Sequence, residues 1–381
     1  MQRPLGRAGT MVSALGQGTT GTGGFAHVSP ARDRERIDVL RLGIDLGMTL
    51  IDTAELYGGG HAEELVGRAI AGRRDRVFLA SKFNPGHSRY RDVVAAAEAS
   101  LRRLRTDHFD LYQMHWPEPR VPLEETLAAL AALQRQGKTR HVGLGNCTVA
   151  ELETARRTAG APAIVSVQSE YNLFQRAAEG DVLPYCQREG MTFLAYSVLD
   201  RGSGLPDDPR RALLVGLAEK YGRSVPQIVL RWVLSRSSVV ALVKAAGRAH
   251  VHENAAVTAF ALAEEDVARI DAAFRQRVLY VAPARVRVRS ARLPRAYASL
   301  DEARRNPRDL VPAPEAVALR IAAGQVLKPL PLVPRAGGHD GGYDLIDGEV
   351  LYWAWAIAKG MEEPMPAFVK GGVSAGEEDA S

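Results

Sequence analysis

Residues Leu50–Gly58 read L-I-D-T-A-E-L-Y-G, and this stretch organises the interpretation of the whole chain. Its short apolar run favours a buried strand that ends at Asp52, and the three glycines after Tyr57 favour a loop. An acid and a phenol therefore stand together where a strand ends, so the phenol can meet a substrate. A plainer interpretation, an N-cap aspartate and a packing tyrosine, stays open on this stretch alone.

The composition is that of a globular protein with room for one large and one small core. The chain has 381 residues, of which 46% are hydrophobic and 24% are charged. It contains no apolar run of about eighteen residues and no basic-then-apolar N-terminus, so we expect no membrane span, no secretory signal and a cytoplasmic location. Cys147 and Cys186 match no metal spacing, so we expect reduced thiols and no metal site.

Positive charge is concentrated in one segment near the C-terminus. The formal net charge is +5, and residues 275–310 hold ten arginines against three acids, Asp301, Glu302 and Asp309. Such a segment predicts either an anionic partner, nucleic acid included, or an interface between domains or subunits, where arginine is common. We favour the interface and expect no nucleic-acid partner.

Short β-like runs alternate with amphipathic helices over about the first 240 residues, a pattern that favours a parallel sheet with crossover helices. The runs are Ala14–Gly18, Thr49–Asp52, Val77–Lys82, Phe109–His115, His141–Gly145, Ile164–Gln168, Thr192–Tyr196 and Val239–Val243. Expected helices between them include Asp33–Gly47, Arg91–Leu104, Leu123–Arg135, Val149–Arg157 and Ala212–Tyr221. Eight such units predict an α/β fold, a closed (β/α)₈ TIM barrel, with a small N-terminal hairpin over its floor.

The barrel pattern ends near Phe274, after a helical stretch Glu264–Phe274. Beyond it we expect a strand in V-L-Y-V-A-P, a helix Pro314–Ala323, an extended run Leu327–Pro334 and an apolar helix after Y-D-L-I-D-G-E. We assign residues 1–276 to the barrel and 277–371 to a small α+β domain. The acidic, Gly- and Ser-rich residues 372–381 are expected to be a disordered tail.

Polar residues stand at the ends of most of the predicted strands, where a (β/α)₈ barrel carries its chemistry. They are Asp52, Lys82, His115, Asn146, Gln168, Tyr196 and Lys244. Core packing would have placed apolar side chains at several of these positions. We therefore interpret the strand ends as one shared site.

Asp52, Tyr57, Lys82 and His115 form the candidate catalytic set. A phenol is a poor proton donor at neutral pH unless its phenolate is stabilised, which the Lys82 cation could do while Asp52 balances the buried charge. His115 would give a neutral hydrogen bond to a carbonyl oxygen. The set could polarise a C=O group and move one proton, but reduction also needs a hydride. No side chain donates one, so a nicotinamide cofactor is implied.

The other strand ends suit that cofactor. The amides of Asn146 and Gln168 could bind the nicotinamide carboxamide, and Tyr196 offers a flat face for the ring. A phosphate could meet the N-terminus of the helix opened by Lys244, Arg248, His250, Glu253 and Asn254. Taken singly, each residue also fits a structural role, as a satisfied core amide or a solvated helix residue.

From about Leu5 to Phe274 the chain resembles the aldo-keto reductase family. The resemblance rests on I-D-T-A-E-L-Y-G, Ser81–Lys82, L-Y-Q-M-H-W, V-G-L-G-N, V-S-V-Q-S-E-Y-N, L-A-Y-S and Glu253–Asn254, in that order. It implies that the four candidate residues form a tetrad with Tyr57 as general acid and base, in an NAD(P)H-dependent oxidoreductase of aldehydes and ketones. The expected cofactor residues are Gly18, Thr19, Asn146, Gln168, Tyr196, Ser197, Leu199, Lys244, Arg248, His250, Glu253 and Asn254.

Three positions depart from the family pattern. Gly145 stands where a Ser usually precedes the Asn, Ala245 where a Ser follows the Lys, and His250 where an Arg contacts the 2′-phosphate of NADP. Arg248 could take over that contact. The expected cofactor is NADP(H), with NAD(H) left open, and the loop 197–208 is short for wrapping around it.

The segment from about Leu279 to Lys370 resembles the ParB/sulfiredoxin-like fold through Y-D-L-I-D-G-E and the helix after it. Relatives of that fold place an Arg where this chain has Leu351, and the segment has no Cys for sulfiredoxin chemistry. We interpret it as a degenerate module, its aromatics Tyr352, Trp353 and Trp355 serving packing, that covers the barrel mouth or forms a homo-oligomer.

The leading hypothesis is an NAD(P)H-dependent interconversion of a carbonyl and an alcohol on a small molecule. The pocket candidates Phe25, Phe83 and Trp116 are mixed with polar residues, which favours a hydroxylated substrate such as a sugar or cyclitol. Two alternatives stay open. One is a nucleotide- or DNA-binding regulator that uses the Arg-rich C-terminal domain on a non-catalytic barrel, and the other is a cofactor-binding sensor without turnover.

Overall fold

The computed structural model describes residues 1–21, 30–199, 210–275, 278–288, 297–325, 327–335 and 342–369. The chain divides into two compact units, one of residues 1–204 and 214–270 and one of residues 205–213 and 271–381. The described residues of the first unit form a barrel, and those of the second form a separate sheet with its own helices.

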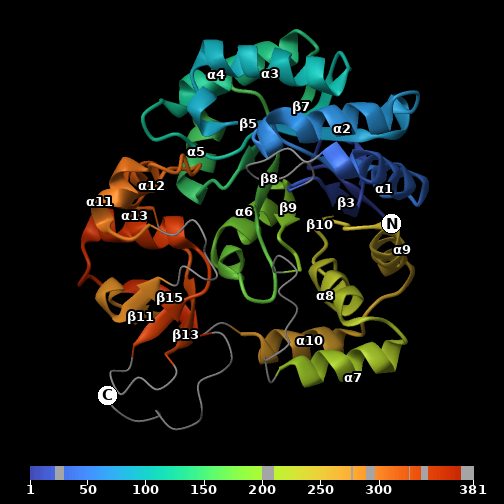
Figure 1. The fold of residues 1–381 in the computed structure, drawn as a ribbon. Helices are drawn as coiled ribbons and strands as arrows, with labels where there is room; N and C mark the ends of the chain where they lie inside the picture. Colours follow the sequence, from blue (N-terminus) through green and yellow to red (C-terminus); the bar gives the residue numbers. More distant parts are fainter. Residues whose placement is uncertain are drawn as a thin grey trace. The chain divides into compact units, whose positions relative to one another are not determined.

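Eight parallel strands of the first unit close into a barrel in the order β10-β3-β4-β5-β6-β7-β8-β9 (Figure 1). They are β3 (Leu15–Gly18), β4 (Leu50–Asp52), β5 (Phe78–Phe83), β6 (Phe109–Met114), β7 (Thr139–Gly145), β8 (Ile164–Glu170), β9 (Thr192–Tyr196) and β10 (Val239–Val243). This confirms the predicted (β/α)₈ barrel, and each predicted strand is present with its ends shifted by two residues at most.

Helices follow the strands and surround the barrel (Figure 1). They are α1 (Asp33–Asp45), α2 (His61–Ile70), α3 (Tyr90–Leu104), α4 (Leu123–Arg135), α5 (Val149–Arg157), α6 (Val182–Glu189), α7 (Arg211–Tyr221), α8 (Val225–Val233), α9 (Arg248–Ala255) and α10 (Glu264–Ala273). Two begin with capping boxes, Thr148 with Glu151 at α5 and Ser224 with Gln227 at α8. These local signals set helix starts because they satisfy backbone N–H groups that have no partner within the helix.

The floor of the barrel is apolar and is covered by a hairpin. Strands β1 (Gln2–Pro4) and β2 (Met11–Ser13) pair antiparallel, as predicted. Leu5 and Val12 of this segment pack in one buried cluster with lumen residues of the strands, among them Leu50 and Leu111. Apolar side chains thus close the floor of the lumen.

The second unit contains a five-stranded sheet in the order β11-β15-β13-β14-β12. Its elements are β11 (Leu279–Val281), β12 (Val286–Val288), α11 (Leu300–Arg305), α12 (Pro314–Ala322), β13 (Leu330–Pro334), β14 (Tyr343–Leu345), α13 (Glu349–Lys359) and β15 (Met365–Val369). Tyr297, Tyr352, Trp353 and Leu332 belong to its own buried core. Throughout both units, none of the helices that the structure describes is long and apolar enough to span a bilayer.

Candidate active site

Two neighbouring strands deliver the central ion pair of the site. Asp52 is the last residue of β4, and Lys82 lies near the end of β5. Both side chains turn into the lumen because residues two apart on a strand share a face, and Leu50 and Ala80 are already lumen residues. Lys82 Nζ lies 2.7 Å from Asp52 Oδ2 and donates to the Thr53 carbonyl at 2.9 Å. The cation is therefore fixed in position.

The environment keeps Lys82 charged although it is fully buried. Burial alone opposes the ammonium form, but Asp52 and Tyr57 outweigh it, so the pKa of Lys82 is raised above its ordinary value. Asp52 is held in turn by Gln168, whose Nε2 donates to Asp52 Oδ1 at 2.9 Å. Both oxygens of this buried carboxylate therefore have a hydrogen-bonding partner.

Tyr57 is brought to this cation by a tight turn. The residue begins a 3₁₀ turn, and the next three residues are glycines with positive φ, a conformation that disfavours side chains. Lys82 Nζ donates toward the Tyr57 hydroxyl at 3.5 Å, and the Tyr57 ring meets the His115 ring edge-on, with centroids 5.7 Å apart. The phenol thus lies between a cation and an imidazole, as the sequence predicted.

His115 follows β6 and stays neutral at this position. Burial and the Lys82 charge lower its pKa well below the ordinary histidine value. Its ring stacks on Trp116 with centroids 3.9 Å apart, and Trp116 is partly exposed. A neutral imidazole next to a phenol can donate one hydrogen bond to a carbonyl oxygen.

The amides expected at the nicotinamide have partners within the protein. Asn146 donates to the His115 carbonyl at 3.0 Å, and its Oδ1 accepts from the Tyr196 hydroxyl at 2.8 Å. Gln168 points to Asp52 and not outward, so its amide N–H supports the tetrad. Thr19, buried after β3, donates to the Asp52 carbonyl at 3.0 Å through its hydroxyl. These contacts join the ends of six strands in two groups, β6, β7 and β9 in one and β3, β4 and β8 in the other.

The residues predicted around the cofactor phosphates extend from the end of β10 through α9. Lys244, Arg248 and His250 are exposed, and Asn254 is buried. Glu253 accepts from the Ser224 hydroxyl, and its carbonyl accepts from Gln227 Nε2 at 2.8 Å. The exposed cations at a helix N-terminus form the donor set that a phosphate needs.

Other predicted residues fall outside the site or outside the described chain. Phe83 is fully buried against Tyr112, with ring centroids 5.7 Å apart, so it packs outside the lumen and does not line a pocket. The reason is strand alternation, since Lys82 takes the inward position. Ser197 has positive φ and a carbonyl that accepts from Asn172, and Leu199 is half-buried. Phe25, the loop beyond Leu199 and residues 372–381 lie outside the described residues.

A buried charge network that the sequence did not predict supports the tyrosine turn. Glu63 of α2 is fully buried, accepts from the Ser81 hydroxyl at 2.6 Å and pairs with Arg103 at 2.7 Å. Arg103 packs so closely on Gly60 that a Cβ there would lie 2.6 Å from it. The network therefore joins α2 and α3 to the strand of Lys82. In the amino-acid sequence, the only local sign of this network is an acidic residue, Glu63, within an amphipathic helix.

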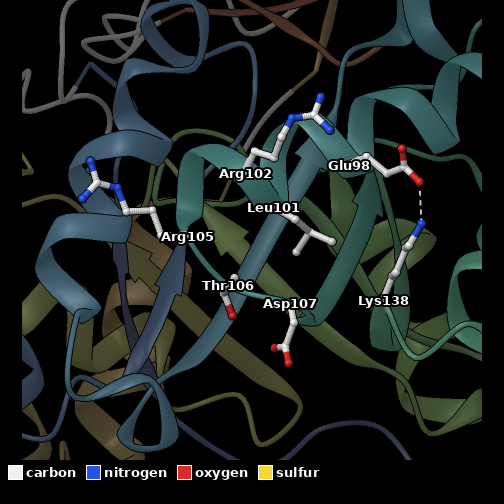
Figure 2. A pocket seen from close by; sticks show the side chains of 7 residues that line it. All are labelled: Glu98, Leu101, Arg102, Arg105, Thr106, Asp107 and Lys138. Carbon is white, nitrogen blue, oxygen red and sulfur yellow. Dashed lines mark hydrogen bonds and ion pairs between the residues drawn. The ribbon is translucent and has the colours of Figure 1, made fainter.

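A surface cavity of the described chain lies away from the tetrad, and the described residues form no metal cluster. Figure 2 shows that cavity, of about 560 Å³, beside α3. Its lining residues are Glu98, Leu101, Arg102, Arg105, Thr106, Asp107 and Lys138, with Glu98 and Lys138 paired at 2.5 Å. Thr106 and Lys138 precede β6 and β7, whereas the tetrad stands at the opposite strand ends. Within the described residues, no group of three His, Cys, Asp or Glu could hold a metal ion.

Comparisons with known proteins agree with this geometry. A sequence model of the Aldo/keto reductase family matches residues 14–275. Methylglyoxal reductase YeaE of Escherichia coli is 40% identical over 262 residues, which cover 68% of this chain and 90% of that protein. The match lies in the barrel unit, and the C-terminal segment falls beyond it.

Two solved structures show the same fold. An aldo/keto reductase from Klebsiella pneumoniae in complex with NADP and acetate is 37% identical, with a TM-score of 0.67, over 71% of this chain and 94% of that one. The glycerol dehydrogenase AKR11B4 from Gluconobacter oxydans is 30% identical, with a TM-score of 0.65, over 71% of this chain and 94% of that one.

Proposed function

The chain belongs to the aldo/keto reductase family and is an NAD(P)-dependent oxidoreductase, and we propose that it interconverts the carbonyl and alcohol of a small hydroxylated substrate, such as a sugar or cyclitol. The observation that carries the proposal is the buried Asp52–Lys82 pair whose cation reaches the Tyr57 hydroxyl. A fully buried ion pair is not needed for packing, because apolar residues of similar volume often stabilise a core as well.

Each residue of the tetrad has a role that its surroundings support. Tyr57 gives a proton to the carbonyl oxygen during reduction and takes it back during oxidation, while Lys82 stabilises the phenolate. Asp52 holds the Lys82 ammonium in place. His115, kept neutral, orients and polarises the carbonyl by one hydrogen bond.

NADP(H) is the cofactor that the exposed residues fit. It supplies the hydride that no side chain can donate. Asn146 and Tyr196 would lie at the nicotinamide, and the exposed Lys244, after β10, and Arg248, at the start of α9, would meet the phosphates. Arg248 is the candidate for the 2′-phosphate, because His250 stands where the family has an Arg. An imidazole there, in place of a guanidinium, would leave NAD(H) as a second cofactor.

Support for a hydroxylated substrate comes from the mouth and from the relatives. Among the described residues, Trp116 stacks on the catalytic imidazole, and the strand ends below the mouth carry the polar side chains of Asp52, Lys82 and Gln168. One relative is a reductase of methylglyoxal, and another is a dehydrogenase of glycerol, both small polar molecules. A panel of ketoses, polyols and aminosugars with NADPH and NADP would rank the substrates.

The experiment that tests the mechanism is Tyr57→Phe. Turnover should fall by about 10²-fold or more, the usual scale for general acid–base catalysis, because the proton donor is lost. NADPH binding, measured by fluorescence titration, should stay nearly unchanged. Full turnover in this variant would exclude Tyr57 as the proton-transfer group and with it the proposed mechanism.

For the C-terminal unit we propose a degenerate ParB/sulfiredoxin-like domain, beginning near residue 277, that serves packing or assembly. Two features support this over a nucleotide site. Leu351 replaces the expected Arg, and the buried Glu349 carboxylate at the start of α13 accepts from the backbone N–H of Tyr297. A carboxylate already occupies the end of the helix that would otherwise favour phosphate.

Two described arginines of this unit also form ion pairs within it. Arg287 forms a two-bond ion pair with Asp344 at 2.8 and 3.3 Å, and Arg308 pairs with Glu302 at 3.2 Å. Less of the positive charge is therefore free for nucleic acid. Binding of labelled DNA by the full chain, competed with salt, is the test of the regulatory alternative.

A further inference from the structure

Three buried polar groups beneath the tetrad lack partners in the described structure. Gln113 is fully buried, and both its amide oxygen and its amide nitrogen are unsatisfied. Ser166 Oγ is likewise buried without a partner, and so is Nδ1 of His115. Each unmade hydrogen bond of this kind costs about 1–3 kcal/mol, so a hidden partner is expected.

Gln113 and Ser166 lie at the same level of the lumen. In the strand register, Gln113 is opposite Gly143, and Gly143 is opposite Ser166. A Cβ built on Gly143 would meet Ser166 Oγ at 2.5 Å and Gln113 Oε1 at 2.9 Å. The two side chains therefore approach each other over Gly143, whose lack of a side chain makes room for them, yet their oxygens form no hydrogen bond with each other. One water molecule between them would satisfy both.

The same strand carries His115 on the same face, one step nearer the mouth. Residues two apart on β6 point to one side, so His115 stands above Gln113, and Lys82 is opposite Gln113 on β5. His115 retains 5% of its surface exposed, and Nδ1 is its enclosed ring nitrogen. Nε2 is thus the nitrogen that faces the mouth.

Catalysis by a neutral His115 depends on which nitrogen carries the proton. To donate to a substrate carbonyl, Nε2 must be protonated, and Nδ1 must then accept a hydrogen bond. The buried side of the ring offers Nδ1 no donor among the described protein groups in hydrogen-bonding position. A water held below it can supply that donor.

We propose that Gln113 and Ser166 hold an internal water that donates to Nδ1 of His115 and so fixes the Nε2-protonated tautomer facing the substrate. Gln113 is then a positioning residue, and the lack of a side chain at Gly143 makes room for the side chains of Gln113 and Ser166. The inference deepens the proposed function, on which it rests, but its main readout does not require turnover.

The test is the tautomer of His115 in the full-length protein. A ¹H–¹⁵N spectrum of the histidine rings, with the His115 signals assigned by their loss in His115→Asn, should show Nε2 protonated and Nδ1 accepting. In Gln113→Met the signals should shift toward the other tautomer. Turnover with NADPH should fall about 2- to 10-fold, the factor equivalent to one neutral hydrogen bond, with little change in KM for NADPH.

Gln17→Met is the matched control. Gln17 is also buried, but its Nε2 donates to the carbonyls of Leu40 and Met48, away from His115. It should lower Tm without moving the His115 signals. A wild-type spectrum with Nδ1 protonated, or His115 signals unchanged in Gln113→Met, would overturn the proposal.

A second variant and a second method keep the inference testable if Gln113→Met does not fold. Ser166→Ala removes the other contact with a smaller change in volume and should shift the same signals in the same direction. A high-resolution crystal structure of the wild type should show a water bonded to Gln113 and Ser166. A structure without a water between Gln113 and Ser166 would contradict the proposal. Failure of the Tyr57→Phe test would leave these tautomer results unaffected, so the two ideas fail separately.

Discussion

The two ends of the barrel lumen are built on the same strands and behave differently. At the floor the inward positions are Leu50, Ala80 and Leu111, all fully buried and apolar. Two or four residues later the same face carries Asp52, Lys82 and His115. Because one strand supplies both ends, rigid apolar packing at the floor holds the polar ends in register. Along each strand, the residues that stabilise the barrel and the residues that carry the chemistry are thus separated by about one repeat of the strand's side-chain alternation.

Lys82→Met should have the largest effect, because it places an apolar side chain, like those of the floor, at a position in the barrel mouth. It removes the cation beside Tyr57, so turnover should fall by about 10²- to 10⁴-fold. It also leaves Asp52 buried without its charge partner, which should lower the free energy of unfolding by about 3–5 kcal/mol. Steady-state kinetics and urea unfolding measure the two effects.

The double variant Asp52→Asn with Lys82→Met is the control for that prediction. It removes both charges, so most of the stability should return while turnover stays low. Recovery of turnover in the double variant would show that the ion pair has no part in catalysis.

Leu111→Ala tests the floor. The side chain is fully buried in the lumen cluster, so its truncation should cost about 2–5 kcal/mol of unfolding free energy through lost burial and the cavity left behind. Turnover per folded molecule, measured well below the midpoint of unfolding, should remain within about twofold of wild type. A large loss of kcat at full folding would mean that floor and mouth are not separable.

Arg248→Ala concerns a mouth residue that takes no part in proton transfer. If this exposed side chain binds the 2′-phosphate, NADPH binding should weaken by about 1.5–3 kcal/mol, the range for a charged hydrogen bond, and NADH binding should hardly change. Fluorescence titration with both cofactors decides the matter, with His250→Ala as the neighbouring control. Equal losses for the two cofactors would remove Arg248 from the discrimination.

The smallest expected effect is a pH dependence of the free energy of unfolding that arises from His115 at the barrel mouth. The folded-state pKa of His115 lies well below 6.5, because burial and Lys82 disfavour its charge. Above pH 6.5 the ring is neutral in both the folded and the unfolded chain. Below that pH the unfolded chain takes up a proton that the folded chain does not, so the free energy of unfolding decreases as the pH is lowered. The loss should be on the order of 1 kcal/mol per pH unit.

His115→Asn isolates this contribution. Urea unfolding at about pH 7 and pH 5.5 should show a smaller loss of stability in the variant than in the wild type, while His141 and the other titrating groups act equally in both. Identical slopes in the two proteins would show that His115 is not held neutral.

Much of the barrel could be predicted because its signals are local. Strand ends such as Asp52 and Lys82 follow directly from short apolar runs that stop at a polar residue, and the helix starts follow from capping residues such as Thr148 and Ser224. The predicted approach of Tyr57 to Lys82 and His115 needed only the rule that parallel strands present their C-terminal ends together.

The sequence by itself determined the eight strands, their order and the chemical character of their ends, since each of these is written in a window of a few residues. Only the tertiary structure decided that Gln168 holds Asp52 across 116 residues of chain, that Phe83 turns outward, and that Glu63 joins Arg103. The unsatisfied group of Gln113, Ser166 and His115 also became visible only there. The reason is physical: which side chains meet inside a closed barrel depends on the stagger between strands, and that stagger is set by closing the whole sheet.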